Sequence, residues 1–430
     1  MSQANDQTKP VPDPRRHAAF FRQSGWLIIA AVLSGLLAYG VHFLAKSESV
    51  SKAQYAAFGT FLMVVACLPT LPLQMILTQQ TALALARGQL RQLAGTIRLV
   101  WRWTFLIWLA GAALVFVFQD KIMAGWHLPD ARGLWITVFL ILVSIWMPLF
   151  LGVLQGRQDF FWMGWATILS SVGRVGGAVV LVLLLSLGAS GMLAGALLGM
   201  GAGVVITLWR SRDLWGGPAE RADATMLRRQ VVPLLFGFLA FQFLFTSDTM
   251  FAKAYFNDDE MGPYVAAGTL ARGLMWLVMP MAAVMFPKLV QSNARREKSN
   301  LFGLVVLGTA GLLVCGGLGL WLMGPLAIKI IYKSTYLGAV TLIPWYALAM
   351  VPLAMANVLV NDLLARGRFG VVPFMLLLAV AYGFTLPWIL NHHPGRIELV
   401  LQTLAVFGTL LFGLCAWFTW GVKRKAEAAV

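Results

Sequence analysis

The feature that most constrains this chain is a series of apolar runs, each close to the length of a membrane-spanning helix. An α-helix needs about 20 apolar residues to cross a bilayer core about 30 Å thick. Strands of a membrane barrel would show alternating segments of about ten residues, and this pattern is absent from the sequence. The sequence therefore predicts an all-α polytopic membrane protein with about 12 transmembrane helices, near residues 25–45, 54–78, 98–118, 134–155, 161–186, 190–209, 231–253, 263–286, 301–323, 340–361, 370–390 and 399–421.

Composition and charge agree with a membrane protein. The chain is 59% hydrophobic and only 12% charged, whereas about a quarter of the residues of a soluble protein are charged. A net charge of +16 would suit a nucleic-acid partner, but the Lys and Arg residues lie mostly in loops at alternate ends of the runs. We therefore expect membrane lipids as partners, and no nucleic acid.

The loop charges also predict the orientation. The side that holds both termini carries 23 Lys and Arg residues and the opposite side carries eight. Because positive loops stay in the cytoplasm, both termini are predicted to be cytoplasmic. The first apolar run has no small-residue cleavage site after it, which favours a retained helix over a cleaved signal peptide.

The chain divides into two halves. After six runs comes a polar cytoplasmic linker, residues 210–230, which separates a six-helix lobe at 25–209 from a second at 231–421. Tyr55-Ala-Ala-Phe-Gly-Thr60 recurs as Tyr264-Val-Ala-Ala-Gly-Thr269. Parallel repeats of this kind occur in transporters, with the substrate site between the halves. Residues 1–24, with three prolines, predict a disordered cytoplasmic tail, and residues 422–430 predict a second tail.

Signals for metal, cofactor or nucleophilic chemistry are weak. Cys67, Cys315 and Cys415 each fall inside an apolar run and lack metal-site spacing, so they are interpreted as small buried hydrophobic residues. His392 and His393 have no third ligand. The phosphate-binding loop of ATPases is absent. We therefore expect no catalytic residues, no metal, no cofactor and no enzyme activity.

Three charged residues lie inside apolar runs: Arg174, Asp248 and Arg272. A charge at the centre of a bilayer is costly and usually faces a partner or a water-filled cavity. The two arginines are candidates for binding a diphosphate, since a guanidinium stays protonated and forms bidentate contacts. They could equally form structural ion pairs. Asp248 could pair with Arg272, form a salt bridge near Lys253, or bind a coupling cation.

Two further patterns concern glutamine and glycine. Gln79 and Gln80 could donate hydrogen bonds to sugar hydroxyls, or bond to neighbouring helices or headgroups. Glycines recur every fourth residue from Gly191 to Gly203. Such a stripe favours close approach of a neighbouring helix over contact with substrate.

Several stretches resemble a known family. They are YAAFGTFLMVVACLPTLPLQMILTQQTALALARG (55–88), LFLGVLQGRQDFFWMGW (149–165), SSVGRVGGAVVLVLLL (170–185) and residues 233–289. The sequence resembles the polysaccharide-biosynthesis or oligosaccharide flippases, which include O-antigen flippases. Their superfamily also holds lipid II flippases and multidrug-and-toxin exporters. The chain departs from the family pattern in two ways. It is rather short, and its LTQQTA segment, at the end of the second run, is poor in acidic residues.

The resemblance implies two six-helix lobes around a central cavity and alternating access. It implies a flippase that moves a polyprenyl-diphosphate-linked oligosaccharide from the inner to the outer leaflet of a bacterial inner membrane. The candidate substrate-binding residues are Arg174, Arg272, Asp248, Lys253, Gln79 and Gln80. A monomer is expected, with membrane proteins of glycan synthesis as further partners. The alternatives are a cation-coupled multidrug antiporter of the same fold and a non-transporting component of a glycan-synthesis complex.

Overall fold

The structure is a computed structural model that describes residues 14–128, 130–220, 224–275 and 301–421. Every regular element in these ranges is a helix. Among the described residues, eleven helical segments are long and apolar enough to cross a membrane, and they coincide with eleven of the twelve predicted runs. The eighth run, 263–286, begins within α10 (Asp258–Arg272) and continues outside the described residues. The predicted fold class is confirmed.

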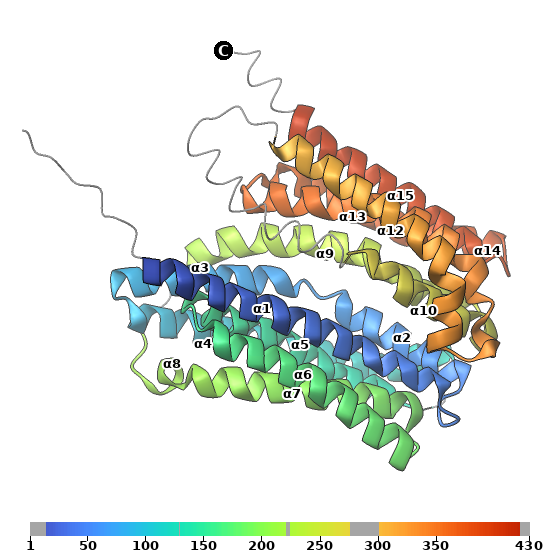
Figure 1. The fold of residues 1–430 in the computed structure, drawn as a ribbon, viewed down its shortest axis with the longest axis horizontal. Coiled ribbons are helices and arrows are strands. Elements are labelled where there is room, and N and C mark those ends of the chain that lie inside the picture. The colour runs from blue at the N-terminus through green and yellow to red at the C-terminus, as the bar shows by residue number, and fades with distance from the viewer. Residues whose placement is uncertain (1–13, 129, 221–223, 276–300, 422–430) are drawn as a thin grey trace, which may run out of the picture.

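The helices form two groups that lie side by side (Figure 1). In the first group, α6 packs against α1 and α7, and α5 packs against α3 and α7. In the second, α13 packs against α12 and α15, and α9 packs against α14. The first group comprises α1 (Pro14–Gly40), α2 (Lys52–Ala66), α3 (Thr70–Arg87), α4 (Leu90–Gly125), α5 (Arg132–Gly156), α6 (Phe160–Val179) and α7 (Gly188–Arg210). The second comprises α9 (Ala224–Tyr255), α10, α12 (Leu301–Ile331), α13 (Ala339–Ala365), α14 (Val372–His392) and α15 (Glu398–Ala416).

The two groups meet through α2 and α3. Helix α2 packs against both α9 and α10, and α3 packs against α9. In Figure 1 the groups come together at the right, where α2 and α10 lie, whereas α1 begins and α15 ends toward the left. The end where α2 and α10 meet carries the loops that the charge pattern predicts to be outside the cell, and we call it the outer end.

The structure adds two details to the predicted organisation. Helix α1 begins at Pro14, so the second half of the predicted disordered tail is helical. Proline suits the first position of a helix because its φ is already helical and its missing N–H would be unbonded there. The predicted run 54–78 is divided between α2 and α3, because Pro69 lacks an N–H and disfavours helical backbone at the residue before it.

The start of the predicted linker is bonded to the first group of helices. Arg157 donates to Asp213 at 2.6 Å, and Arg210 donates to Asp159 at 2.7 Å. The hydrogen bond from Arg157 holds the pKa of the Asp213 carboxyl below its ordinary value. Arg98 donates to the carbonyl of Trp215 and, at 2.6 Å, to that of Gly217, just after the short helix α8 (Arg212–Gly216). The first part of the linker therefore belongs structurally to the first lobe.

Candidate functional site

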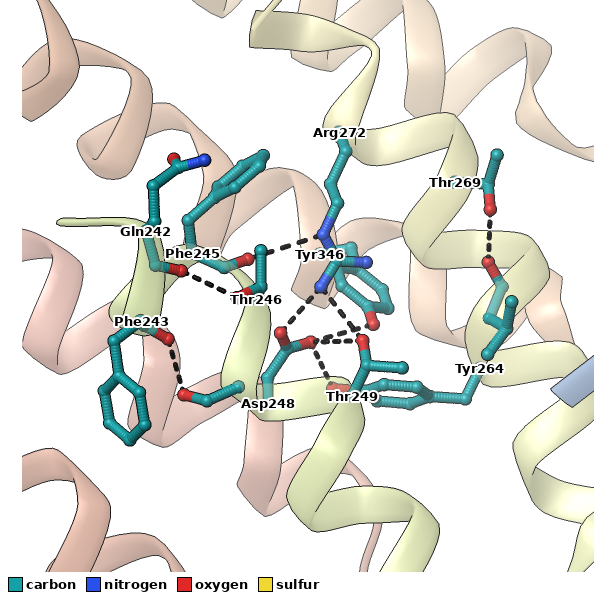
Figure 2. A network of polar contacts seen from close by, with 12 residues as sticks. Gln242, Phe243, Phe245, Thr246, Asp248, Thr249, Tyr264, Thr269, Arg272 and Tyr346 are labelled. Carbon is teal, nitrogen blue, oxygen red and sulfur yellow. Dashed lines mark hydrogen bonds and ion pairs between the residues drawn. The ribbon is translucent and has the colours of Figure 1, made fainter. Parts of the chain in front are cut away.

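The second lobe contains a buried carboxylate, that of Asp248 on α9. Its side chain is fully buried, with 0% exposure. Oδ1 accepts a hydrogen bond from Nη2 of Arg272 at 2.6 Å (Figure 2). Of the three alternatives that the sequence left open for Asp248, the structure shows the pairing with Arg272. A buried carboxylate needs such a partner, because an uncompensated charge in a low-dielectric interior is strongly unfavourable.

The second carboxylate oxygen of Asp248 accepts three hydrogen bonds. Oδ2 accepts from the hydroxyls of Tyr264 at 2.8 Å, Tyr346 at 3.2 Å and Thr249 at 3.3 Å. These donors come from α10, α13 and α9, so the carboxylate ties together three helices of the second lobe. Because Arg272 already neutralises the carboxylate and Oδ2 accepts from three hydroxyls, a bound cation would have to displace these partners.

Arg272 is enclosed to a similar degree. Its Nη2 also donates to the hydroxyl of Thr249 at 3.1 Å, and its guanidinium lies over the rings of Phe245 and Tyr346 at 5.7 and 5.6 Å from their centroids. Figure 2 shows the side chain reaching down from α10 to the carboxylate on α9. The positive charge of Arg272 is thus neutralised inside the protein.

Arg174, on α6, has a different environment. Its Nε is buried and has no hydrogen-bond partner among the described residues, and no carboxylate described by the structure forms an ion pair with it. Two glycines of α7, Gly195 and Gly199, lie directly against its backbone. Arg174 is therefore a cation held firmly by packing but without a counter-ion in the described part of the chain.

The remaining predicted residues are not brought into the Asp248 cluster. Lys253, only 2% exposed, pairs with Asp258 rather than with Asp248. Gln79 is exposed and Gln80 half-buried on α3, and no described contact joins either to Asp248 or Arg272. Within the described ranges no group of three or more His, Cys, Asp or Glu side chains could hold a metal ion.

Sequence reasoning missed a second polar cluster, at the outer end where the lobes meet. Nδ1 of His42 lies 2.8 Å from the hydroxyl of Tyr55, which in turn lies 2.9 Å from the hydroxyl of Tyr332 in the other lobe. The internal repeat in the sequence could have indicated that Tyr55 belongs to such a cluster. Tyr55 and Tyr264 occupy equivalent places in the two copies, and each is fully buried with its hydroxyl hydrogen-bonded.

Comparison with known proteins gives a family and a fold. Residues 20–293 match a family described as polysaccharide biosynthesis protein. No curated protein matches the chain.

Among solved structures, an inward-facing multidrug resistance MATE family transporter of the MOP superfamily is 12% identical, with a TM-score of 0.70 over 92% of this chain and 94% of that one. The lipid II flippase MurJ in an inward closed conformation is 14% identical, with a TM-score of 0.66 over 91% and 87%. An outward-facing MATE transporter is 13% identical, with a TM-score of 0.62 over 95% and 96%. At such identities the likeness shows the fold.

Proposed function

The chain belongs to the polysaccharide biosynthesis protein family, and from that membership we propose that it is a flippase for polyprenyl-diphosphate-linked oligosaccharides. It would carry the saccharide from the inner to the outer leaflet of a bacterial inner membrane, with both termini in the cytoplasm. Residues 25–209 and 231–421 would be the two lobes that move during alternating access, joined by the linker at 210–230. The fold shared with MATE transporters and MurJ supports this proposal.

The observation that carries the proposal is that Arg174 has no counter-ion in the part of the chain that the structure describes. A guanidinium inside an apolar lobe is expensive unless a partner compensates its charge. The structure describes no such partner, and a diphosphate would supply one through charge-assisted, bidentate hydrogen bonds. In this proposal Arg174 contacts the diphosphate, and Gln79 and Gln80 are candidates for contact with sugar hydroxyls.

For Arg272 we choose the structural ion pair from the two roles that the sequence left open. Because Asp248 neutralises it, we propose that Arg272 and Asp248 together hold α9, α10 and α13 in one rigid unit. Lys253 with Asp258 would do the same at the outer end of that lobe. In this proposal the positive charge that binds the diphosphate comes mainly from the first lobe.

The direction of transport has a physical basis. A diphosphate that moves outward leaves an inside-negative compartment and gains about 2.3 kcal/mol per elementary charge for each 100 mV. Arg174 remains in the protein, so it shields the substrate charge in transit without cancelling this gain.

The arrangement at Asp248 argues against the alternative of a cation-coupled multidrug antiporter. Such a protein would need an accessible carboxylate to bind its cation, whereas both oxygens of Asp248 are bonded within the lobe. A non-transporting component of a glycan-synthesis complex would not need a half-buried arginine that has no counter-ion among the described residues.

The test is binding of a lipid-linked oligosaccharide diphosphate to purified protein. We expect Arg174→Ala to weaken binding about tenfold or more, equal to at least about 1.4 kcal/mol, with partial recovery in Arg174→Lys. The control is the double variant Asp248→Leu/Arg272→Met, which removes a buried arginine together with its counter-ion and should bind normally. Unchanged binding in Arg174→Ala, with the fold intact, would refute the proposal.

A further inference from the structure

The outer end of the seam between the lobes is closed by a chain of buried hydrogen bonds. His42 and Tyr55 belong to the first lobe, and Tyr332 follows α12 in the second. The two links measure 2.8 Å and 2.9 Å. The exposed fractions of these side chains are 7%, 0% and 1% in chain order. We call these three residues the outer relay.

The relay is packed as tightly as a protein core. The ring of Tyr55 meets the rings of Tyr332 and Tyr336 edge to face, with centroids 5.5 and 5.7 Å apart. Burial raises the pKa of the Tyr332 phenol well above its ordinary value, so its hydroxyl keeps its proton and can donate. One turn further along α2, Gly59 lies against Val265 of α10 so closely that any side chain at residue 59 would overlap it. The relay therefore lies in a dry seam.

Two ion pairs flank the relay but add little to it. Lys52 bonds to Asp259 at 2.9 Å and Lys333 to Glu48 at 3.1 Å, and both pairs join the lobes. The carboxylates of Asp259 and Glu48 are 84% and 98% exposed. Exposed pairs contribute little, because water and salt screen them. Hydrogen bonds in a dry site are costly to break, because each leaves an unpaired polar group behind.

Among the described residues, hydrogen bonds and ion pairs between the lobes are fewer away from the outer end. Farther from the outer end, Gln242 of α9 donates a hydrogen bond to the carbonyl of Ala66 at 2.6 Å. Ala66 is the last residue of α2. The bonds that join the lobes are thus concentrated at the outer end.

We propose that the outer relay of His42, Tyr55 and Tyr332 is the latch that keeps the two lobes closed toward the outside, and that its rupture opens the seam. Its role in transport rests on the proposed flippase function, but the latch itself is a property of the lobe contact. Tyr55 is its central member because its hydroxyl bonds to both of the others.

The test follows the opening of the seam with one cysteine. Val265→Cys is placed in a chain whose Cys67, Cys315 and Cys415 are replaced by Ala, and purified protein is treated with a maleimide. Val265 is 4% exposed, so labelling should be slow in the parent. Tyr55→Phe removes both relay bonds and should speed labelling about tenfold, which corresponds to about 1.4 kcal/mol. High salt should change the rate little.

Two controls separate the latch from a general loss of packing. Tyr336→Phe removes the hydroxyl of a ring in the same cluster, but that hydroxyl has no hydrogen-bond partner among the described residues, so labelling should stay slow. Ala354→Cys reports on the interior of the second lobe, where this residue is 0% exposed, and it should stay unlabelled in Tyr55→Phe.

Equal rates in Tyr55→Phe and Tyr336→Phe would overturn the proposal, as would labelling of Ala354→Cys that rises with that of Val265→Cys. No saccharide enters this experiment. A protein whose seam opens as expected but which binds no lipid-linked diphosphate would refute the proposed function alone.

Discussion

At the scale of single residues, the ion pair of Asp248 and Arg272 makes a sharp prediction about stability. Asp248→Ala leaves a buried guanidinium uncompensated, and breaking a buried pair in this way costs about 3–5 kcal/mol. The double variant Asp248→Leu/Arg272→Met removes both charges and should recover most of that loss. Unfolding midpoints in detergent measure both effects. A double variant as unstable as Asp248→Ala would show that the surrounding hydroxyls, rather than the charge, govern this site.

The same residues show how far sequence reasoning reaches. The pairing of Asp248 with Arg272 was predictable, because both lie in the outer halves of helices adjacent in the chain. That Arg174 has no counter-ion within the described ranges was not predictable, because this depends on how α1, α6 and α7 pack in space. Tyr332 was missed for a related reason: its partner Tyr55 is 277 residues away, and no periodic pattern encodes such a contact.

At the scale of elements, the glycine stripe of α7 was predicted to allow close approach, and α6 is the helix that approaches. A methyl group on Gly199 would overlap the backbone of Ser170 and Arg174, whereas one on Gly201 meets nothing within 4 Å. We therefore expect Gly199→Ala to destabilise the protein by about 1–3 kcal/mol, as overpacking does, and to weaken diphosphate binding by displacing Arg174. Gly201→Ala should leave both unchanged. Equal unfolding midpoints for the two variants would contradict the close packing of α6 and α7.

Helices were easier to predict than their connections. Runs of about 20 apolar residues identify a membrane helix by length alone, so all eleven spans found among the described residues were recognisable in the sequence. The attachment of the linker to the first lobe was not, because Arg98 lies 119 residues from the carbonyl of Gly217 that it binds. A basic residue near a headgroup region has many possible partners, and only the folded chain selects one.

At the scale of the whole molecule, alternating access requires the outer ends of the lobes to separate in each cycle. Glu48 and Lys333 face each other across the seam at 3.1 Å, so cysteines at both positions can be joined by a short bis-methanethiosulfonate, which forms a reducible disulfide with each thiol and releases methanesulfinate. The cross-link should abolish transport of a lipid-linked oligosaccharide in proteoliposomes, and reduction should restore it.

The matched control joins two residues of one lobe. Asp159 and Arg210 also form an ion pair, at 2.7 Å, but both belong to the first lobe. Cross-linked cysteines at these positions should leave transport intact, because the lobe moves as one body. If the cross-link between the lobes were harmless as well, the outer seam would not open during transport, and the substrate would have to cross by a path that leaves the lobes closed at this end.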